Sequence, residues 1–338
     1  MHCALPPKAP PVPAALVIRT TACGYVKVVP GGRVVRWHAP HWPGTARAGH
    51  GVWVRHTGGR LTLVRNGRVF WRSRVSRGSD AVVIHGRTIA YAAYPSRYED
   101  SEEVWLARVG GSERRIARHE GPLGWTRAGL LLLQRGRDID VRDSSGRHRA
   151  KLRFRQSLFQ WNTSSLLALT YDGRLVRSDG RSSTTIAHVV DRRWTITDVL
   201  RGGLIVLTRT GALLVLDRDG HRYAFAAYSQ HADVGGTITA LPDGSIVFPL
   251  LRGGIDRVLL LQRGARKPVQ LLARRLPPSC GHWTSLTYHR GRLLYASQGR
   301  IVVVDPLRKQ RPIDLTRFVR SFAPRNDEAF ADWAVNLG

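Results

Sequence analysis

The chain has 338 residues, of which 43% are hydrophobic and 23% are charged. This composition allows a sizeable core and argues against global disorder, and no apolar run approaches the ~18 residues of a transmembrane helix. The formal net charge is +29, from 53 basic and 24 acidic residues. Such a field attracts polyanions. The arginines, however, are spread over almost every predicted strand end and turn, without a basic helix or a nucleic-acid-binding motif.

The N-terminal segment is rich in proline. Residues 1–13, MHCALPPKAPPVP, predict a flexible tail, and residues 14–338 are expected to form a single domain. The stretch PAALVIRTTAC is similar to the core of a signal peptide, but it is short and is interrupted by Arg19. We therefore expect a cytoplasmic protein, or an extracytoplasmic one if the true start lies upstream.

Hairpins closed by glycine recur along the chain. The turn glycines are spaced 44, 35, 34, 40 and 44 residues apart, and the flanking strands are short and rich in Val, Ile and Leu. Asn-Gly and Asp-Gly pairs supply the positive φ that tight hairpin turns need. The spaced glycines are Gly67, Gly111, Gly146, Gly180, Gly220 and Gly264.

Two further apolar runs precede most of these hairpins. The first carries an aromatic residue, and the second is strongly aliphatic, as in GLLLL, SLLALT and GLIVLT. Continuous apolar runs predict strands that are covered on both faces, and the lack of capped 3.6-residue periodicity predicts almost no helix. The aromatic residues of the first runs are Trp125, Trp161, Trp194 and Trp283.

Four short strands every ~40 residues predict a β-propeller built from four-stranded blades. A single blade cannot bury its own faces, so each tryptophan is expected to act as a wedge between neighbouring blades. Eight hairpins favour eight blades, with seven as the alternative because the inner strand around Trp42 is faint. The opening pattern recurs around Trp333, so the N- and C-terminal strands are expected to share a blade and close the ring; a truncated gene product is the competing explanation.

The segments GWTRAGLLLL and QWNTSSLLALT, together with the intact Pro-Asp-Gly of LPDGSIVF, resemble the repeats of TolB-like and WD-repeat-like bacterial propellers. The resemblance covers nearly the whole chain. It implies a propeller architecture and the binding of proteins or ligands, and it transfers no catalytic residues.

Reactive residue types do not form a recognisable catalytic or metal-binding pattern. Histidines cluster early, at His38, His41, His50 and His56, but they lack the nearby cysteines or acids that a zinc site would require. The acidic run YEDSEE, at residues 98–103, is expected to be a solvated loop. We therefore predict no catalytic, cofactor-binding or metal-binding residues and no cofactor.

The three cysteines cannot all pair with one another. Cys23 and Cys280 both precede a glycine near a predicted strand, and ring closure could bring them together as a disulfide. Burial of both as small hydrophobic residues is the alternative.

The sequence thus predicts a monomeric, non-enzymatic binding or scaffold protein that contacts another protein through one rim. Loops on a rigid scaffold are the usual place for recognition, and the longer connections PHWPGTARAGH, SQHADVGG and RRLPPSCGH stand out. Two alternatives stay open. One is a polyanion binder whose arginines gather on one face, and the other is an enzyme with its site at the mouth of a central channel.

Overall fold

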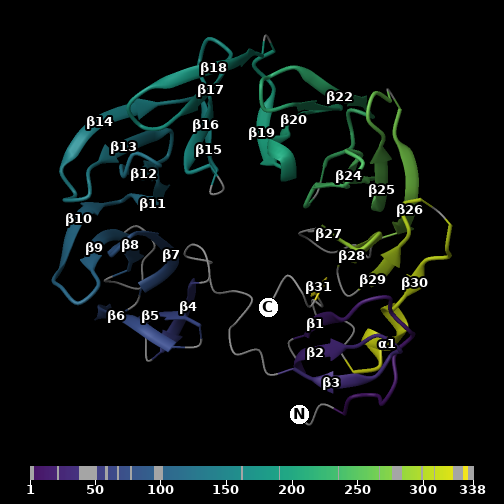
Figure 1. Ribbon diagram of the computed structural model, residues 1–338. Coiled ribbons are helices and arrows are strands. Elements are labelled where there is room, and N and C mark those ends of the chain that lie inside the picture. The colour runs from purple at the N-terminus through teal and green to yellow at the C-terminus, as the bar shows by residue number, and fades with distance from the viewer. Residues whose placement is uncertain are drawn as a thin grey trace. The chain divides into compact units, whose positions relative to one another are not determined.

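The structure is a computed structural model, and the chain forms two compact units. We call residues 40–196 the middle unit and residues 1–39 with 197–338 the terminal unit. Each unit holds four β-sheets, which we call blades and number in chain order (Figure 1). The residues that the structure describes are 4–20, 23–37, 52–57, 60–66, 68–76, 78–94, 102–160, 163–189, 191–234, 236–265, 267–275, 284–297, 300–307, 309–322 and 330–333.

The middle unit contains blades 2 to 5, and the strands of each blade follow one another in sequence. Blade 2 has three described strands, and the faint inner strand predicted around Trp42 lies outside the described residues. The strands are β4 (Val52–Thr57), β5 (Arg60–Arg65) and β6 (Arg68–Ser76) in blade 2; β7 (Gly78–His85), β8 (Thr88–Ala93), β9 (Glu103–Arg108) and β10 (Glu113–Arg118) in blade 3; β11 (Gly121–Trp125), β12 (Leu131–Arg135), β13 (Asp138–Arg142) and β14 (His148–Arg153) in blade 4; and β15 (Gln156–Gln160), β16 (Ser165–Leu169), β17 (Arg174–Ser178) and β18 (Ser183–His188) in blade 5.

The terminal unit contains blades 6, 7, 8 and 1. Its described helices are only the short η2 (Arg201–Gly203) and α1 (Thr316–Arg320), as the sequence predicted. The strands are β19 (Thr195–Val199), β20 (Ile205–Arg209), β21 (Ala212–Leu216) and β22 (Arg222–Ala227) in blade 6; β23 (Thr239–Ala240), β24 (Ile246–Arg252), β25 (Ile255–Leu261) and β26 (Val269–Arg275) in blade 7; β27 (Thr284–His289), β28 (Arg292–Ser297), β29 (Arg300–Val304) and β30 (Ile313–Asp314) in blade 8; and β31 (Phe330–Trp333), β1 (Leu16–Thr20), β2 (Gly24–Val28) and β3 (Val34–Arg36) in blade 1.

Blade 1 joins the two ends of the chain. Strand β31 pairs antiparallel with β1, with Leu16 opposite Trp333 and Arg19 opposite Phe330 (Figure 1). The prediction that the N- and C-terminal strands share a blade is therefore confirmed. The pairing gives β1 a partner on both sides and so removes an exposed strand edge.

The Pro-rich segment predicted as a flexible tail packs against blade 1. The Ala9 N–H donates to the Gly32 carbonyl oxygen at 2.8 Å, and the side chains of Ala9 and Val12 are buried among the core residues of this blade. Proline removes backbone donors, but the alanine and valine between the prolines still supply apolar surface that packing can bury.

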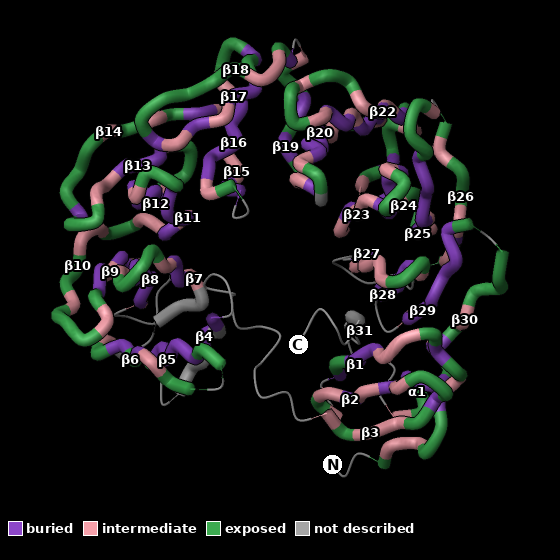
Figure 2. Tube along the Cα trace, in the orientation of Figure 1, coloured by how far each residue is buried: buried purple, intermediate pink, exposed green. Residues whose placement is uncertain are grey.

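Burial follows the order of the strands within a blade. The second and third strands are apolar runs such as β12 and β16, whose leucines are fully buried, whereas outer strands such as β14 and β18 are largely exposed (Figure 2). An apolar run that is covered on both faces must have neighbouring sheets on each side. Within each unit, neighbouring blades therefore stabilise one another.

The packing between blades is visible in the composition of the core clusters. Blade 3 contributes Val83 and Leu106 to a cluster that blade 4 completes with Leu131 and Leu133. Gly180, in the hairpin turn of blade 5, has φ +88°, and a Cβ there would lie 3.3–3.4 Å from aliphatic carbons of blade 4. A glycine at this turn allows both the positive φ and the close approach.

Candidate ligand-binding site

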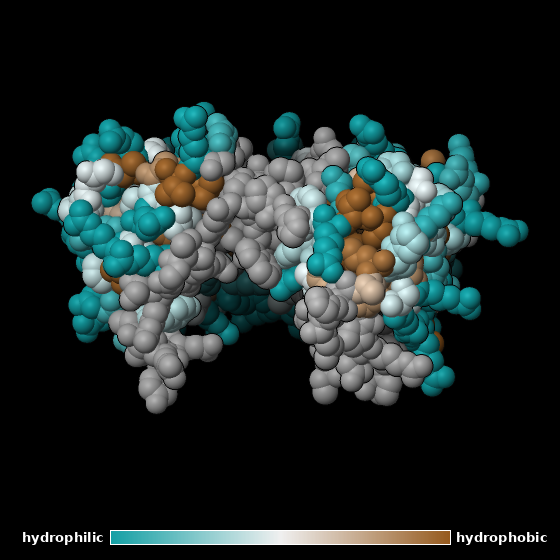
Figure 3. Space-filling view, turned by 90° about the horizontal axis from the view of Figure 1, so that it is seen from below, coloured by the Kyte–Doolittle hydropathy of each residue, from teal (hydrophilic) through white to brown (hydrophobic). Residues whose placement is uncertain are grey.

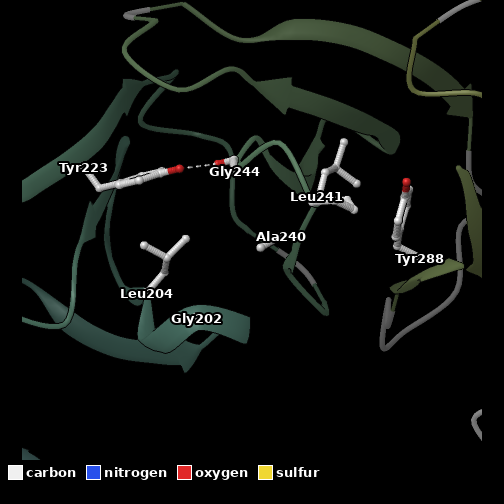
Figure 4. A pocket seen from close by; sticks show the side chains of 8 residues that line it. Gly202, Leu204, Tyr223, Ala240, Leu241, Gly244 and Tyr288 are labelled. Carbon is white, nitrogen blue, oxygen red and sulfur yellow. Dashed lines mark hydrogen bonds between the residues drawn. The ribbon is translucent and has the colours of Figure 1, made fainter. Parts of the chain in front are cut away.

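A cavity of about 570 Å³ lies in the terminal unit, where blades 6, 7 and 8 meet (Figure 4). Its walls are mostly aliphatic and aromatic, and Tyr223 and Tyr288 stand at opposite ends with Ala240 between them. The lining residues are Gly202, Leu204, Tyr223, Ala240, Leu241, Pro242, Gly244 and Tyr288. Cavities of this size with apolar walls and a few polar groups are typical of ligand sites.

Turns at one edge of the blades bring these residues together. Gly202 lies in η2 between β19 and β20, and Gly244 closes the turn between β23 and β24. Both have positive φ, +84° and +83°, which these tight connections require. Tyr223 is near the start of the outer strand β22, and Tyr288 is near the end of the inner strand β27. The site therefore depends on the stacking of three blades.

One end of the cavity is fixed by a hydrogen bond and a cation–π contact. The Tyr223 hydroxyl donates to the Gly244 carbonyl oxygen at 2.9 Å (Figure 4), and the Arg263 guanidinium lies 5.3 Å from the centre of the Tyr223 ring. Arg263 is exposed and forms no ion pair with an acid among the described residues. This end of the cavity therefore combines an oriented aromatic ring with an available positive charge.

The other end of the cavity carries the Tyr288 hydroxyl. Tyr288 is half-buried, and its hydroxyl forms no hydrogen bond with any residue in the described part of the chain. The remaining walls come from aliphatic side chains, proline and glycine backbone. The cavity can therefore hold an apolar group and offer a hydrogen bond at one end and a cation at the other.

A separate buried polar network links blade 7 to blade 8. One Asp256 carboxylate oxygen accepts hydrogen bonds from the Thr284 hydroxyl at 2.6 Å and the Tyr295 hydroxyl at 2.9 Å. All three residues are at most 2% exposed. Burial, followed by the Asp256 charge and hydrogen bond, raises the pKa of Tyr295 well above its usual value. The hydroxyl thus stays protonated and donates, which suits a structural link between blades.

Blade 3 holds a second tyrosine at the equivalent strand position. The Tyr91 hydroxyl donates to a Glu113 carboxylate oxygen at 2.8 Å, and this carboxylate also accepts the backbone N–H of Arg74 from blade 2. Burial, followed by the Glu113 hydrogen bond, raises the pKa of Tyr91. Both networks therefore join neighbouring blades through a tyrosine and an acid.

The chain is similar to several solved structures. AztD from Citrobacter koseri superposes with a TM-score of 0.52 at 8% identity, over 94% of this chain and 98% of that one. Hsv2 from Kluyveromyces lactis gives a TM-score of 0.49 at 8% identity over 75% and 89%, and the β-propeller domain of Cps50 (Swd1) from Myceliophteria thermophila gives 0.39 at 13% over 72% and 87%.

The fold is a β-propeller of eight blades. The eight sheets confirm the favoured blade count over the alternative of seven. No protein-family model matches the sequence, and no curated protein matches it either. At these identities the structural likeness establishes the fold alone.

The propeller places the predicted wedge tryptophans as follows. Trp125 is buried between blades 3 and 4, where it stacks on His85 with ring centres 5.5 Å apart. Trp194 is also buried, and its carbonyl oxygen accepts a hydrogen bond from Arg155 at 2.7 Å. Trp161 and Trp283 lie outside the described residues, and only the backbone of Trp333 is described.

Cys23 follows β1, and its sulfur atom lies 3.4 Å from the Phe322 carbonyl oxygen. Cys23 is disulfide-bonded, but Cys3 and Cys280 both lie outside the described residues. Pairing of Cys23 with Cys280 therefore stays a prediction.

Predicted histidine and acidic features fall only partly within the described chain. The side chains of the early histidine cluster lie outside it, and no group of three or more His, Cys, Asp or Glu side chains in the described part could hold a metal ion. Glu103, expected in a solvated loop, is instead a buried first residue of β9, ion-paired with Arg115. The sequence pattern could not show this, because the arginine comes from the next strand.

The longer connections predicted as recognition loops are also only partly described. Within SQHADVGG, Asp233 pairs with Leu251 through two backbone hydrogen bonds of 3.0 and 2.9 Å, so this connection extends the edge of blade 7. The connection PHWPGTARAGH and most of RRLPPSCGH lie outside the described residues. Sequence patterns did not single out Tyr223, Tyr288 or Arg263, because these residues meet only when the blades stack.

Positive charge is shared almost equally between the two units. The middle unit has 28 basic and 13 acidic residues, and the terminal unit has 25 and 11. On the face that Figure 3 shows, hydrophobic side chains form small groups separated by hydrophilic ones. No helix in the described part of the chain has the length and apolar character needed to cross a bilayer.

Proposed function

We propose that this propeller is a non-enzymatic binding protein that holds an acidic protein partner at the turns of blades 6, 7 and 8. In this proposal an apolar side chain of the partner enters the cavity between Tyr223 and Tyr288. A carboxylate next to that side chain pairs with Arg263. The observation that carries the proposal is a cavity with mostly aliphatic and aromatic side chains in its lining, whose Tyr223 ring lies 5.3 Å from the exposed Arg263 guanidinium.

The composition of the cavity supports binding rather than catalysis. Among the described residues, its lining contains no carboxylate, histidine, cysteine, serine or lysine, and the two tyrosine hydroxyls are its only titratable groups. Burial of one large apolar side chain contributes about 1.5–3 kcal/mol. Binding energy in protein interfaces concentrates in buried anchors of this kind.

The charge around the cavity supports an acidic partner. Arg222, Arg263 and Lys267 lie in or next to the hairpin turns of blades 6 and 7, and all three are exposed and outside ion pairs with described acids. The nearby Asp243 accepts hydrogen bonds from the Ser245 N–H and hydroxyl at 2.9 and 3.1 Å, so its carboxylate is engaged locally. Complementary charge speeds association and orients the partner.

The two alternatives have less support. A polyanion binder would use the exposed cations of these turns but would leave the cavity unused. An enzyme calls for convergent titratable side chains at a cavity, and the lining described above has only phenols.

The proposal can be tested with synthetic peptides and matched variants. The probe is a nine-residue peptide with a central phenylalanine flanked by glutamates, measured by calorimetry at low and moderate salt. Tyr288→Ala removes one wall of the cavity, and Arg263→Gln removes the cation. Tyr171→Ala and Arg181→Gln are the controls, because both residues are exposed and lie on blade 5.

Each site variant is expected to weaken binding about 5- to 10-fold, which corresponds to about 1–1.4 kcal/mol, and the controls are expected to leave it unchanged. A peptide with lysines in place of the glutamates should bind more weakly. Equal binding of all four variants, or equal binding of the acidic and basic peptides, would overturn the proposal.

A further inference from the structure

Four blades close their third and fourth strands with the same aspartate turn. In each, a carboxylate oxygen of the aspartate accepts the backbone N–H of the residue two positions later, at 2.8–3.0 Å. The aspartates are Asp143, Asp179, Asp217 and Asp305, in blades 4, 5, 6 and 8. The repeat therefore gives four copies of one turn that can be compared position by position.

In blade 8 the residue whose backbone N–H donates to the aspartate is apolar, whereas in the other three blades it is polar. Blades 4, 5 and 6 place Ser145, Arg181 and Asp219 there, all polar and exposed. Blade 8 places Leu307, whose exposed fraction of 63% is the highest among the large hydrophobic residues in the described part of the chain. The turn itself accepts polar residues, so its geometry does not require an apolar side chain at this tip.

We call residues 305–307 and 309–312 the Leu307 turn, and side-chain contacts hold its base in place. Arg292 forms an ion pair of 3.0 Å with the second oxygen of Asp305, and both side chains are largely buried. Arg292 also donates a hydrogen bond to the Gln310 side chain. Pro306 fixes φ directly before the leucine. Asp305 and Gln310 are therefore both anchored to Arg292 of blade 8, and Leu307 between them is exposed.

Three exposed cations lie at the same edge of blade 8 as Leu307. Lys309 and Arg311 are exposed within the same turn, and Arg290 is exposed in the turn between β27 and β28, at the same edge of blade 8. None of the three forms an ion pair with an acid in the described residues. One apolar tip flanked by available cations suits a surface that is anionic outside and apolar beneath.

We propose that the Leu307 turn docks this propeller on an anionic lipid bilayer, with Leu307 entering the headgroup region and Lys309, Arg311 and Arg290 contacting phosphates. A protein partner would call for a contiguous apolar patch around the leucine. The other exposed large hydrophobic residues described, Val69, Tyr171 and Val269, belong to other blades. Docking on a bilayer requires only an apolar tip such as Leu307 and nearby cations.

The test is co-sedimentation of the full chain with vesicles of phosphatidylcholine alone or with about a third phosphatidylglycerol. Leu307→Ser keeps the turn, because serine occupies the same position in blade 4. Val69→Ser is the matched control at another exposed hydrophobic residue, 52% exposed. A Lys309→Gln/Arg311→Gln double variant tests the cations, with Arg181→Gln as its control.

Leu307→Ser is expected to lower partitioning onto anionic vesicles about 5- to 10-fold, and the double cation variant about 20-fold or more, because each cation contributes about fivefold. Both controls should partition like the parent chain. If Leu307→Ser partitions like Val69→Ser while the cation variant is impaired, adsorption is purely electrostatic and the proposal fails. Equal partitioning onto neutral vesicles would also overturn it. None of these residues lines the cavity, so failure here leaves the proposed function intact.

Discussion

The link between blades 7 and 8 through Asp256 offers a quantitative test of how the propeller is held together. Asp256→Ala leaves the Thr284 and Tyr295 hydroxyls buried without their acceptor. Hydrogen bonds to a charged group contribute about 1.5–3 kcal/mol each. Two offsets reduce the loss: Thr284 also contacts Ser297 at 3.3 Å, and removal of a buried carboxylate relieves its desolvation. We expect the free energy of unfolding to fall by about 2–4 kcal/mol.

Urea unfolding followed by tryptophan fluorescence measures this loss. Tyr295→Phe removes one donor and should lower the free energy of unfolding by about 1–2 kcal/mol. The double variant Asp256→Ala/Tyr295→Phe should show a coupling energy of about 1–2 kcal/mol, because Asp256 and Tyr295 share one hydrogen bond. Asp219→Ala is the control, since that side chain is 65% exposed and should cost less than about 0.5 kcal/mol. Additive costs in the double variant, or a loss for Asp256→Ala no greater than for the control, would refute the reasoning.

Three further predictions concern single contacts. Burial, followed by a neighbouring aspartate, raises the pKa of Glu120 above its ordinary 4.5, so the ionised form opposes folding. Glu120→Gln should therefore raise the midpoint of thermal unfolding at pH 7. The gain should disappear below pH 4.5, where the glutamate of the parent chain is as neutral as the glutamine of the variant. An equal gain at both pH values would contradict this reasoning. The Gln156 amide makes two hydrogen bonds of 2.8 and 2.7 Å with the Ile196 backbone. Gln156→Leu should cost about 2–3 kcal/mol in urea unfolding, and a loss below about 0.5 kcal/mol would show that the amide is dispensable. Cys23 is disulfide-bonded and lies in the turn beside the start of β31. Strand β31 contacts β27, and Cys280 precedes β27 by four residues in the sequence. Peptide mapping without reductant should therefore recover a Cys23–Cys280 pair, and recovery of a Cys3 pair would contradict it.

Local pattern was enough to predict the blades. Apolar runs such as the leucines of β12 and β16 can only be strands covered on both faces, and turn glycines such as Gly146 and Gly180 have the positive φ that their spacing implied. The pattern around Trp333 also predicted the pairing of β31 with β1. Each of these features depends on residues that are close in sequence or repeated along it.

The same patterns misplaced residues whose environment comes from elsewhere in the chain. Glu103 was expected in solvent, but Arg115 on the adjacent strand compensates its burial. Ala9 and Val12 lie among prolines, and their side chains are buried because blades 1 and 8 supply the core cluster that they join. The four aspartate turns are spaced 36, 38 and 88 residues apart in the sequence, but the hydrogen bond that defines them is visible only in the structure.

The sequence by itself determined the strands, their turns and the number of blades, because alternation, apolar runs and glycine act over a few residues at a time. Only the tertiary structure decided where a ligand could be held. Leu204, Ala240 and Tyr288 come from three blades and are far apart along the chain. A cavity forms only when stacked sheets bring such residues together, and no local pattern specifies which side chains will face it.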